Sequence, residues 1–190
     1  NPVNNKLQIE ANFAKHLPGL LAEFSHFIVS GFHILSETYP DGTTWLEYLR
    51  PVARFLRETK KTHAHLQFHY EFASIASSAI RQGIIDHILP TVDSLGLNEV
   101  ELCAILRDQD EQKLARDIET HTSMAAVLRG LERLADRTGL RRIQLHDLGY
   151  YLALVDAEFT DGEKCRDGML FAATLAASRS TIGKVGSYED

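Results

Sequence analysis

The sequence predicts an α/β protein with three layers, in which helices cover both faces of a mostly parallel central sheet. Short apolar runs rich in β-branched residues alternate along the chain with longer amphipathic stretches. Strands that alternate with helices pair in parallel through right-handed crossovers, because each crossover helix packs back onto the sheet. The 190 residues suit one domain, and 44% hydrophobic with 24% charged residues is the composition of an ordinary globular protein.

Four apolar runs are predicted to be strands. The first is β-branched and ends in Ser30 and Gly31, small residues that let a loop approach closely. The later run from Tyr150 to Val155 fits a strand or a helix, and the sequence leaves both open. The four predicted strands span 26–31, 66–72, 91–95 and 142–146.

Helices are predicted where apolar residues recur every three or four positions. Trp45 begins such a stripe after a capping threonine, either Thr43 or Thr44. Pro18 is expected to kink or split the first helix, and the charged segment 108–112 is interpreted as a connection. The predicted helices span 7–24, 43 or 44 to about 60, 77 or 78 to 88, about 99 to 107, 123–138, and 164 or 165 to 180.

Charge and cysteine content exclude several classes of partner. The 26 acidic and 20 basic residues leave a net charge of −6, which repels a phosphate backbone, so no nucleic-acid partner is expected. No apolar run approaches the ~18 residues of a membrane helix, so no membrane association is expected. Cys103 and Cys165 lack the spacing of a zinc or redox pair, which predicts ordinary thiols in a reducing cytoplasm.

Two acidic motifs follow consecutive apolar runs. The first is His69-Tyr70-Glu71, and the second runs from Asn98 to Glu101. Where a parallel strand ends and turns into a helix, carboxylates face the crevice outside the sheet, where α/β proteins hold ligands and their metal ions. The two motifs therefore predict a site for a magnesium nucleotide.

These motifs and their flanking residues resemble the ADP-dependent glucokinase and phosphofructokinase family, whose fold is ribokinase-like. The resemblance covers most of the chain, and its strength lies in two motifs that occur in the right order with matching flanks. The segments that carry it are 30–35, 41–42, 67–75, 88–90, 93–102, 142–146, 149–154 and 166–176.

The resemblance implies an enzyme that transfers the β-phosphoryl group of ADP to a hexose or a hexose phosphate. It implies that Glu71 and Glu101 hold Mg²⁺ through its waters and that Asn98 lies near the phosphates. His69 and His146 complete the cofactor-binding set that it predicts. Magnesium dehydrates reluctantly and takes one or two carboxylates with phosphate oxygens, which agrees with this assignment.

One part of the family pattern has no counterpart in these residues. The family's catalytic base is an Asp in a Gly-x-Gly-Asp motif, and the segment 183–190 has two glycines and an acid at other spacings. The family's lid and most of its sugar contacts precede the region of resemblance. We therefore expect residues 1–190 to be the central part of the large domain of an ADP-dependent sugar kinase, incomplete as a domain, without a catalytic residue and inactive alone.

Two other functions compete with this interpretation. The first is a non-catalytic nucleotide-binding or interaction module, that is, a degenerate kinase that kept only the sheet edge at which phosphates bind. Alternatively, His63, His65 and His69 with Glu71 share one face if their strand is unbroken, and that arrangement could build a metal-dependent hydrolase.

Simpler structural roles remain open for the motif residues. His69 is as readily a packed histidine as a ligand, and Asn98 caps the following helix whether or not a nucleotide binds. The residues alone decide neither glucose against fructose 6-phosphate, nor ADP against ATP, nor the oligomeric state. The magnesium hypothesis requires Glu71 and Glu101 to approach one another, and an incomplete domain predicts exposed apolar surface.

Overall fold

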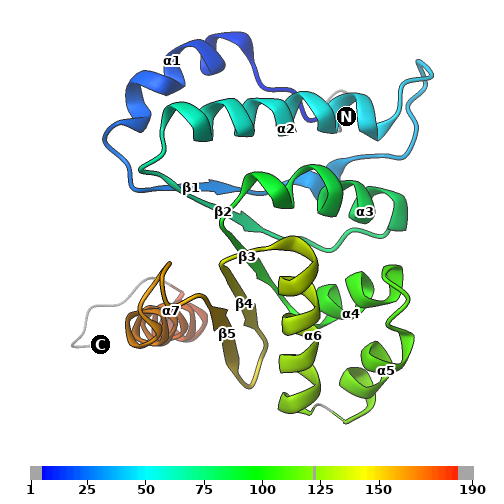
Figure 1. Cartoon of the computed structure of the whole chain (residues 1–190), viewed down its shortest axis with the longest axis vertical. Helices are drawn as coiled ribbons and strands as arrows, with labels where there is room; N and C mark the ends of the chain where they lie inside the picture. The colour runs from blue at the N-terminus through cyan, green and yellow to red at the C-terminus, as the bar shows by residue number, and fades with distance from the viewer. Residues whose placement is uncertain (1–5, 122, 184–190) are drawn as a thin grey trace. The chain divides into compact units, whose positions relative to one another are not determined.

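The computed structural model describes residues 6–121 and 123–183, and the chain divides into two compact units, Asn1–Leu154 and Val155–Asp190 (Figure 1). A five-stranded sheet has its strands in chain order, β1-β2-β3-β4-β5. The strands are β1 (His26–Val29), β2 (Gln67–Glu71), β3 (Ser94–Leu97), β4 (Arg142–His146) and β5 (Tyr151–Val155). The predicted α/β class is confirmed.

The first four strands are parallel, and their register places one residue of each strand in a continuous row across the sheet. Ile28 pairs with His69, His69 with Ser94, and Ser94 with Arg142 across the sheet. The strand β5 follows β4 after only four residues, and a connection this short joins antiparallel strands. The sheet is therefore mixed but mostly parallel, and the open choice for residues 150–155 is decided in favour of a strand.

The helices of the first unit connect successive strands. Because the strands lie in chain order and parallel crossovers are right-handed, the crossover helices α2 to α6 share one face of the sheet. The crossovers of the described part of this unit thus supply one helical layer, where the sequence predicts two. The helices are α1 (Ala11–Leu21), α2 (Trp45–Thr62), α3 (Ser78–His87), α4 (Glu99–Asp108), α5 (Gln112–His121) and α6 (Met124–Thr138).

The two faces of the sheet differ in chemistry. Residues that point toward the helices, such as Phe68 and Tyr70 on β2, are fully buried, whereas the alternate residues of β2 and β4 are half-exposed. Alternation along each strand sends successive side chains to opposite faces. We call the opposite face the polar face, and on β2, β3 and β4 it carries Gln67, His69, Glu71, Ser94, Arg142, Gln144 and His146.

The sequence places β3 three residues too early. Leu89–Thr91 forms a short 3-10 turn, η3, with Pro90 near its start, and the Thr91 hydroxyl donates to the Ile88 carbonyl over 2.7 Å. Proline suits the first turn of a helix and cannot donate to a strand ladder, so pairing begins only at Ser94. The predicted strand 91–95 is therefore corrected to Ser94–Leu97.

The segment interpreted as a charged connection leads into a helix that the sequence analysis omits. The helix α5 begins at Gln112, and Ala115 and Ile118 on it are fully buried against the core. Four of its other eight positions carry charged residues and three carry uncharged polar residues, which hides the apolar stripe. The first helix differs as well, since α1 spans Ala11–Leu21 and passes unbroken through Pro18.

The second unit contains α7 (Gly162–Ile182), which covers the predicted helix 164–180. Asp161 caps its start by accepting from the Lys164 amide over 2.9 Å, and Gly183 ends it in the left-handed region. None of the α7 side chains is buried, and Leu170 and Phe171 are 61% and 57% exposed. With Ile28 of β1 at 69%, these side chains provide the exposed apolar surface expected of an incomplete domain.

Asp93 lies just before β3 and forms hydrogen bonds to α2 and to β2. Its Oδ1 accepts from the Lys60 ammonium on α2 over 2.7 Å, and its Oδ2 accepts from the Phe68 amide of β2 over 2.9 Å. Its backbone amide also donates to the Phe68 carbonyl. The side chain is mostly shielded from water, at 18% exposure, so these charge-assisted bonds are stronger than surface pairs.

We expect Asp93→Ala to lower the free energy of unfolding by roughly 2 kcal/mol, because it leaves the Phe68 amide and the Lys60 ammonium without their acceptor. Denaturant unfolding measures this loss. Asp136→Ala, at an exposed position on α6, is the matched control and should change stability by no more than about 0.5 kcal/mol. Equal losses in the two variants would contradict the role given to Asp93.

No helix in the stretches 6–121 and 123–183 has the length and apolar character needed to cross a bilayer.

Candidate functional site

Parallel pairing gathers the predicted site residues at one edge of the sheet. Glu71 is the last residue of β2, His146 is the last residue of β4, and Asn98 follows directly after β3. The carboxyl ends of parallel strands lie at the same edge, which we call the carboxyl edge. Glu101 belongs to the first turn of α4, which begins at this edge.

Glu71 lies between two imidazole rings. Its Oε2 is 3.1 Å from Nε2 of His69, two positions earlier on the same face of β2. Its Oε1 is 3.9 Å from Nδ1 of His146 on β4, which is beyond hydrogen-bond length. The Glu71 side chain is 37% exposed, so the carboxylate reaches solvent while one oxygen is held.

Glycine at position 96 makes room for the Glu71 carboxylate. The register pairs Glu71 with Gly96 of β3, and a Cβ atom added there would lie 2.1 Å from Glu71 Oε2 and 3.1 Å from His69 Nε2. Any larger residue would therefore displace the carboxylate. The sheet is shaped around the position of Glu71.

Asn98 and Glu101 form a reciprocal capping box at the start of α4. The Glu101 amide donates to Asn98 Oδ1, and the Asn98 amide donates to Glu101 Oε2, both over 2.9 Å. The purely structural role proposed for Asn98 is thus real. It is also compatible with phosphate binding, because the N-terminus of a helix carries partial positive charge and free amides.

Burial raises the pKa of Glu101, whose residue is only 5% exposed. The hydrogen bond from the Asn98 backbone, the charge of His146 and a hydrogen bond from Ser74 act to lower that pKa, while the charge of Glu71 raises it further. The charge of Glu71 therefore reaches Glu101. A cation stabilises a desolvated carboxylate.

Tyr70 lies beneath both carboxylates on the buried face of β2. Burial raises its pKa, and the charges of Glu101 and Glu71 raise it further, so the phenol stays neutral. Its hydroxyl has no hydrogen-bond partner among the described residues. Its ring packs edge-on against Phe32 and Phe72, with centroids 5.4 and 5.6 Å away.

A pocket of about 220 Å³ opens beside Glu101 in the first unit. Arg81 fixes one wall by donating to Asp108 of α4 and to the carbonyls of Ile75 and Ala76. The loop that follows Glu71 is thereby anchored to α3 and α4. The pocket is lined by Phe72, Ser74, Ile75, Ala76, Arg81, Val100, Glu101 and Ala104.

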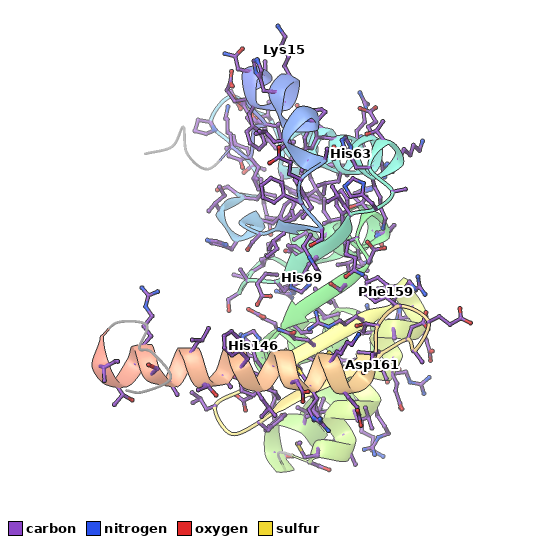
Figure 2. The ribbon with its side chains drawn as sticks, turned by 90° about the vertical axis from the view of Figure 1, so that its left-hand side faces the viewer. Lys15, His63, His69, His146, Phe159 and Asp161 are labelled. Atoms are coloured by element: carbon purple, nitrogen blue, oxygen red, sulfur yellow. The ribbon has the colours of Figure 1, made fainter. Side chains whose placement is uncertain are left out.

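The hydrolase hypothesis for the histidines fails on geometry. His63 ends α2 and lies 3.1 Å from the Pro18 carbonyl, and His65 lies 3.3 Å from the Leu21 carbonyl. The strand β2 begins only at Gln67, so these two histidines do not share a strand face with His69. Figure 2 shows His63 apart from His69. In residues 6–121 and 123–183, no group of three or more His, Cys, Asp or Glu side chains could hold a metal ion.

Sequence reasoning missed three residues of this edge. Ser94 Oγ lies 2.7 Å from Nδ1 of His69, and Gly96 faces Glu71, but the early placement of β3 hides both pairings. Tyr150 donates to Glu99 over 2.9 Å and so joins the β4–β5 connection to α4. Glu99 therefore holds this connection as well as placing a negative charge in the first turn of α4.

The fold and this edge define an α/β protein whose mostly parallel sheet presents two carboxylates, Glu71 and Glu101, at an edge where a helix begins. Residues 1–187 match the family described as the ADP-specific phosphofructokinase/glucokinase conserved region. The chain belongs to this family.

Individual relatives agree with this assignment. The chain is 33% identical over 190 residues to an ADP-dependent glucose/glucosamine kinase of Pyrococcus furiosus, covering 98% of this chain and 39% of that protein. It is 29% identical to an ADP-specific phosphofructokinase of Thermococcus kodakarensis, covering 96% of this chain and 40% of that one. A solved ADP-dependent kinase in complex with fructose-6-phosphate and ADPβS superposes with a TM-score of 0.87 at 29% identity, over 94% of this chain and 40% of its own. The chain thus spans about 40% of the length of these relatives.

We expect Asn98→Ala to destabilise the protein by about 1 kcal/mol, because the first turn of α4 loses its cap. Thermal unfolding measures this change. Asn98→Ser is the matched variant, since its hydroxyl still accepts from the Glu101 amide without adding a negative charge and should preserve stability. A melting temperature that Asn98→Ala leaves unchanged would show that the cap contributes nothing.

The raised pKa of Glu101 predicts a stability difference that depends on pH. A carboxyl whose pKa is raised on folding stabilises the folded state below its unfolded pKa, near 4.5, and this contribution is lost as the pH rises through the folded pKa. Glu101→Gln cannot ionise and still has an oxygen to accept from the Asn98 amide. In EDTA, it should therefore melt above the parent protein at pH 7, by a margin that shrinks below pH 4.5.

Glu58→Gln, at an exposed position on α2, is the control for this experiment. A Glu101→Gln variant that melts below the parent at neutral pH and does not converge with it in acid would contradict the inferred cost of the buried charge.

Proposed function

We propose that this chain is the central part of an ADP-dependent sugar kinase, which transfers the β-phosphoryl group of ADP to glucose or fructose 6-phosphate. The observation that carries the proposal is the placement of two carboxylates at the carboxyl edge, Glu71 at the end of β2 and the buried Glu101 at the N-terminus of α4. Family membership supplies the chemistry, since the relatives are named for ADP and for both sugars.

The residues at this edge fit a magnesium nucleotide. Mg²⁺ prefers oxygen ligands and keeps several waters, so one or two carboxylates with phosphate oxygens are enough to hold it. Glu71 and Glu101 would hold it through its waters, and Asn98 would place the phosphates at the start of α4. When bound, the ion neutralises the negative charge that the transferred phosphoryl group carries.

The remaining predicted residues act around this pair. His146 Nδ1 lies 3.9 Å from Glu71 Oε1, and His146 would contact the nucleotide. His69 holds the other oxygen, so its part in cofactor binding is indirect. No residue of this chain is assigned as the catalytic base, because the Gly-x-Gly-Asp motif of the family has no counterpart in its sequence.

The proposed reaction needs no partner beyond ADP and the sugar. The net charge of −6 supports the absence of a nucleic-acid partner, because a surface of this sign repels a phosphate backbone. We place the reaction in the cytoplasm, where ADP and phosphorylated hexoses occur together.

The test uses the full-length protein that the gene encodes, assayed with ADP or ATP against glucose and fructose 6-phosphate. We expect turnover with ADP on at least one sugar and little with ATP. Saturable ADP binding without turnover on either sugar would instead support the non-catalytic module.

In the same protein, Glu101→Gln should lower the rate at limiting magnesium and be partly restored by higher magnesium. Removing one carboxylate charge weakens the hold on the ion without creating a cavity. Glu58→Gln is the control, because it removes an exposed carboxylate on α2. If added magnesium does not restore the rate of Glu101→Gln, the assignment of Glu101 to the metal is wrong.

A further inference from the structure

Ser94, His69 and Glu71 form a continuous chain of contacts across two strands. Ser94 Oγ lies 2.7 Å from His69 Nδ1, and His69 Nε2 lies 3.1 Å from Glu71 Oε2. Ser94 is 5% exposed, and the His69 side chain is 15% exposed. The register opposes His69 to Ser94 and Glu71 to Gly96, so the parallel pairing of β2 with β3 holds all four residues in place.

The chemistry of these three groups fixes which atom donates and which accepts in each hydrogen bond. An ionised carboxylate can only accept hydrogen bonds, so the neutral His69 ring must carry its proton on Nε2 to bond Glu71. Nδ1 is then an acceptor. The Ser94 hydroxyl, which can donate or accept, must donate to it.

We propose that Ser94 is a positioning residue that holds the His69 ring through Nδ1 and, through that ring, fixes the orientation of the Glu71 carboxylate. This inference rests on the proposed function of Glu71 at the magnesium nucleotide. Metal-site carboxylates are commonly oriented by neighbouring groups that do not themselves touch the ion.

The geometry around Glu71 shows what this orientation achieves. Oε2 is held by His69 and lies over Gly96, where a side chain would collide with it. Oε1 lies 3.9 Å from Nδ1 of His146, too far for a hydrogen bond, and is the oxygen left for the hydrated ion. Both ring nitrogens of His69 are engaged, so His69 serves the site through Glu71.

The first experiment reads the tautomer directly, without any assay of activity. The ring nitrogens of His69 are observed by ¹⁵N NMR in the full-length protein at about pH 8.5, above the ordinary imidazole pKa. The signals are assigned with His69→Gln. We expect a proton on Nε2 alone in the parent protein, and in Ser94→Ala a shifted Nδ1 signal because that nitrogen loses the hydrogen bond from the hydroxyl. A proton on Nδ1 in the parent protein, or an Nδ1 signal that Ser94→Ala leaves unchanged, would overturn the proposal.

The second experiment measures the magnesium dependence of turnover. Ser94→Ala should raise the magnesium concentration for half-maximal rate by on the order of tenfold, with kcat at saturating magnesium and KM for the sugar little changed. Ser94→Thr keeps the hydroxyl and should restore the parent value. A fall in kcat with unchanged magnesium dependence would contradict a positioning role.

A matched control exists at the other end of the sheet. Ser25 Oγ lies 2.8 Å from Nδ1 of His26, in an exposed pair far along the sequence from the site. Ser25→Ala should leave the magnesium dependence unchanged, and an equal shift in this variant would overturn the specific role of Ser94. If the protein proves not to be an ADP-dependent kinase, the NMR experiment still decides the tautomer, so failure of the proposed function and failure of this inference are distinguishable.

Discussion

Parallel pairing of β2, β3 and β4 is the constraint on which the rest of the site depends. It brings the ends of three strands to one edge, although the residues that end them are separated by dozens of positions in the chain. It also opposes Glu71 to Gly96, where a larger residue would collide with the carboxylate. A register shift of one residue would send every side chain of β2 to the other face, so the site and the sheet pairing form together.

The carboxyl edge combines structural and functional demands on the same residues. Asn98 and Glu101 complete the hydrogen bonds of the first turn of α4, which any helix requires. The same capping box holds Glu101 in a buried position where its charge is unfavourable without a cation. Proteins commonly accept such a cost at functional sites, because a group that is fully satisfied in the free protein has little reason to bind a ligand.

The chain spans about 40% of the length of its relatives, and both of its units expose apolar side chains. Ile28, Leu170 and Phe171 remain exposed, while the face covered by the crossover helices is closely packed. The helical layer that the described first unit builds is therefore sufficient to bury one side of the sheet. The carboxyl edge adjoins this closely packed face, since Tyr70 of β2 is fully buried.

The sequence by itself determined the α/β class, most of the helices and the two acidic motifs. Period-2 and period-3.6 patterns are local, and the order of strands and helices limits the topology. It misplaced β3 and omitted α5, because a proline turn before Ser94 and the many charges of α5 obscure those patterns. Its hydrolase hypothesis failed because His63 and His65 precede the strand on which they had been placed.

Only the tertiary structure decided which of the motif residues contact one another. The pairing of His69 with Ser94, the space that Gly96 leaves for Glu71 and the burial of Glu101 all depend on the register between strands. Register is a long-range property, because it is set by packing between segments far apart in sequence. The sequence therefore determines which chemical groups reach the carboxyl edge, and the fold determines how each group is held there.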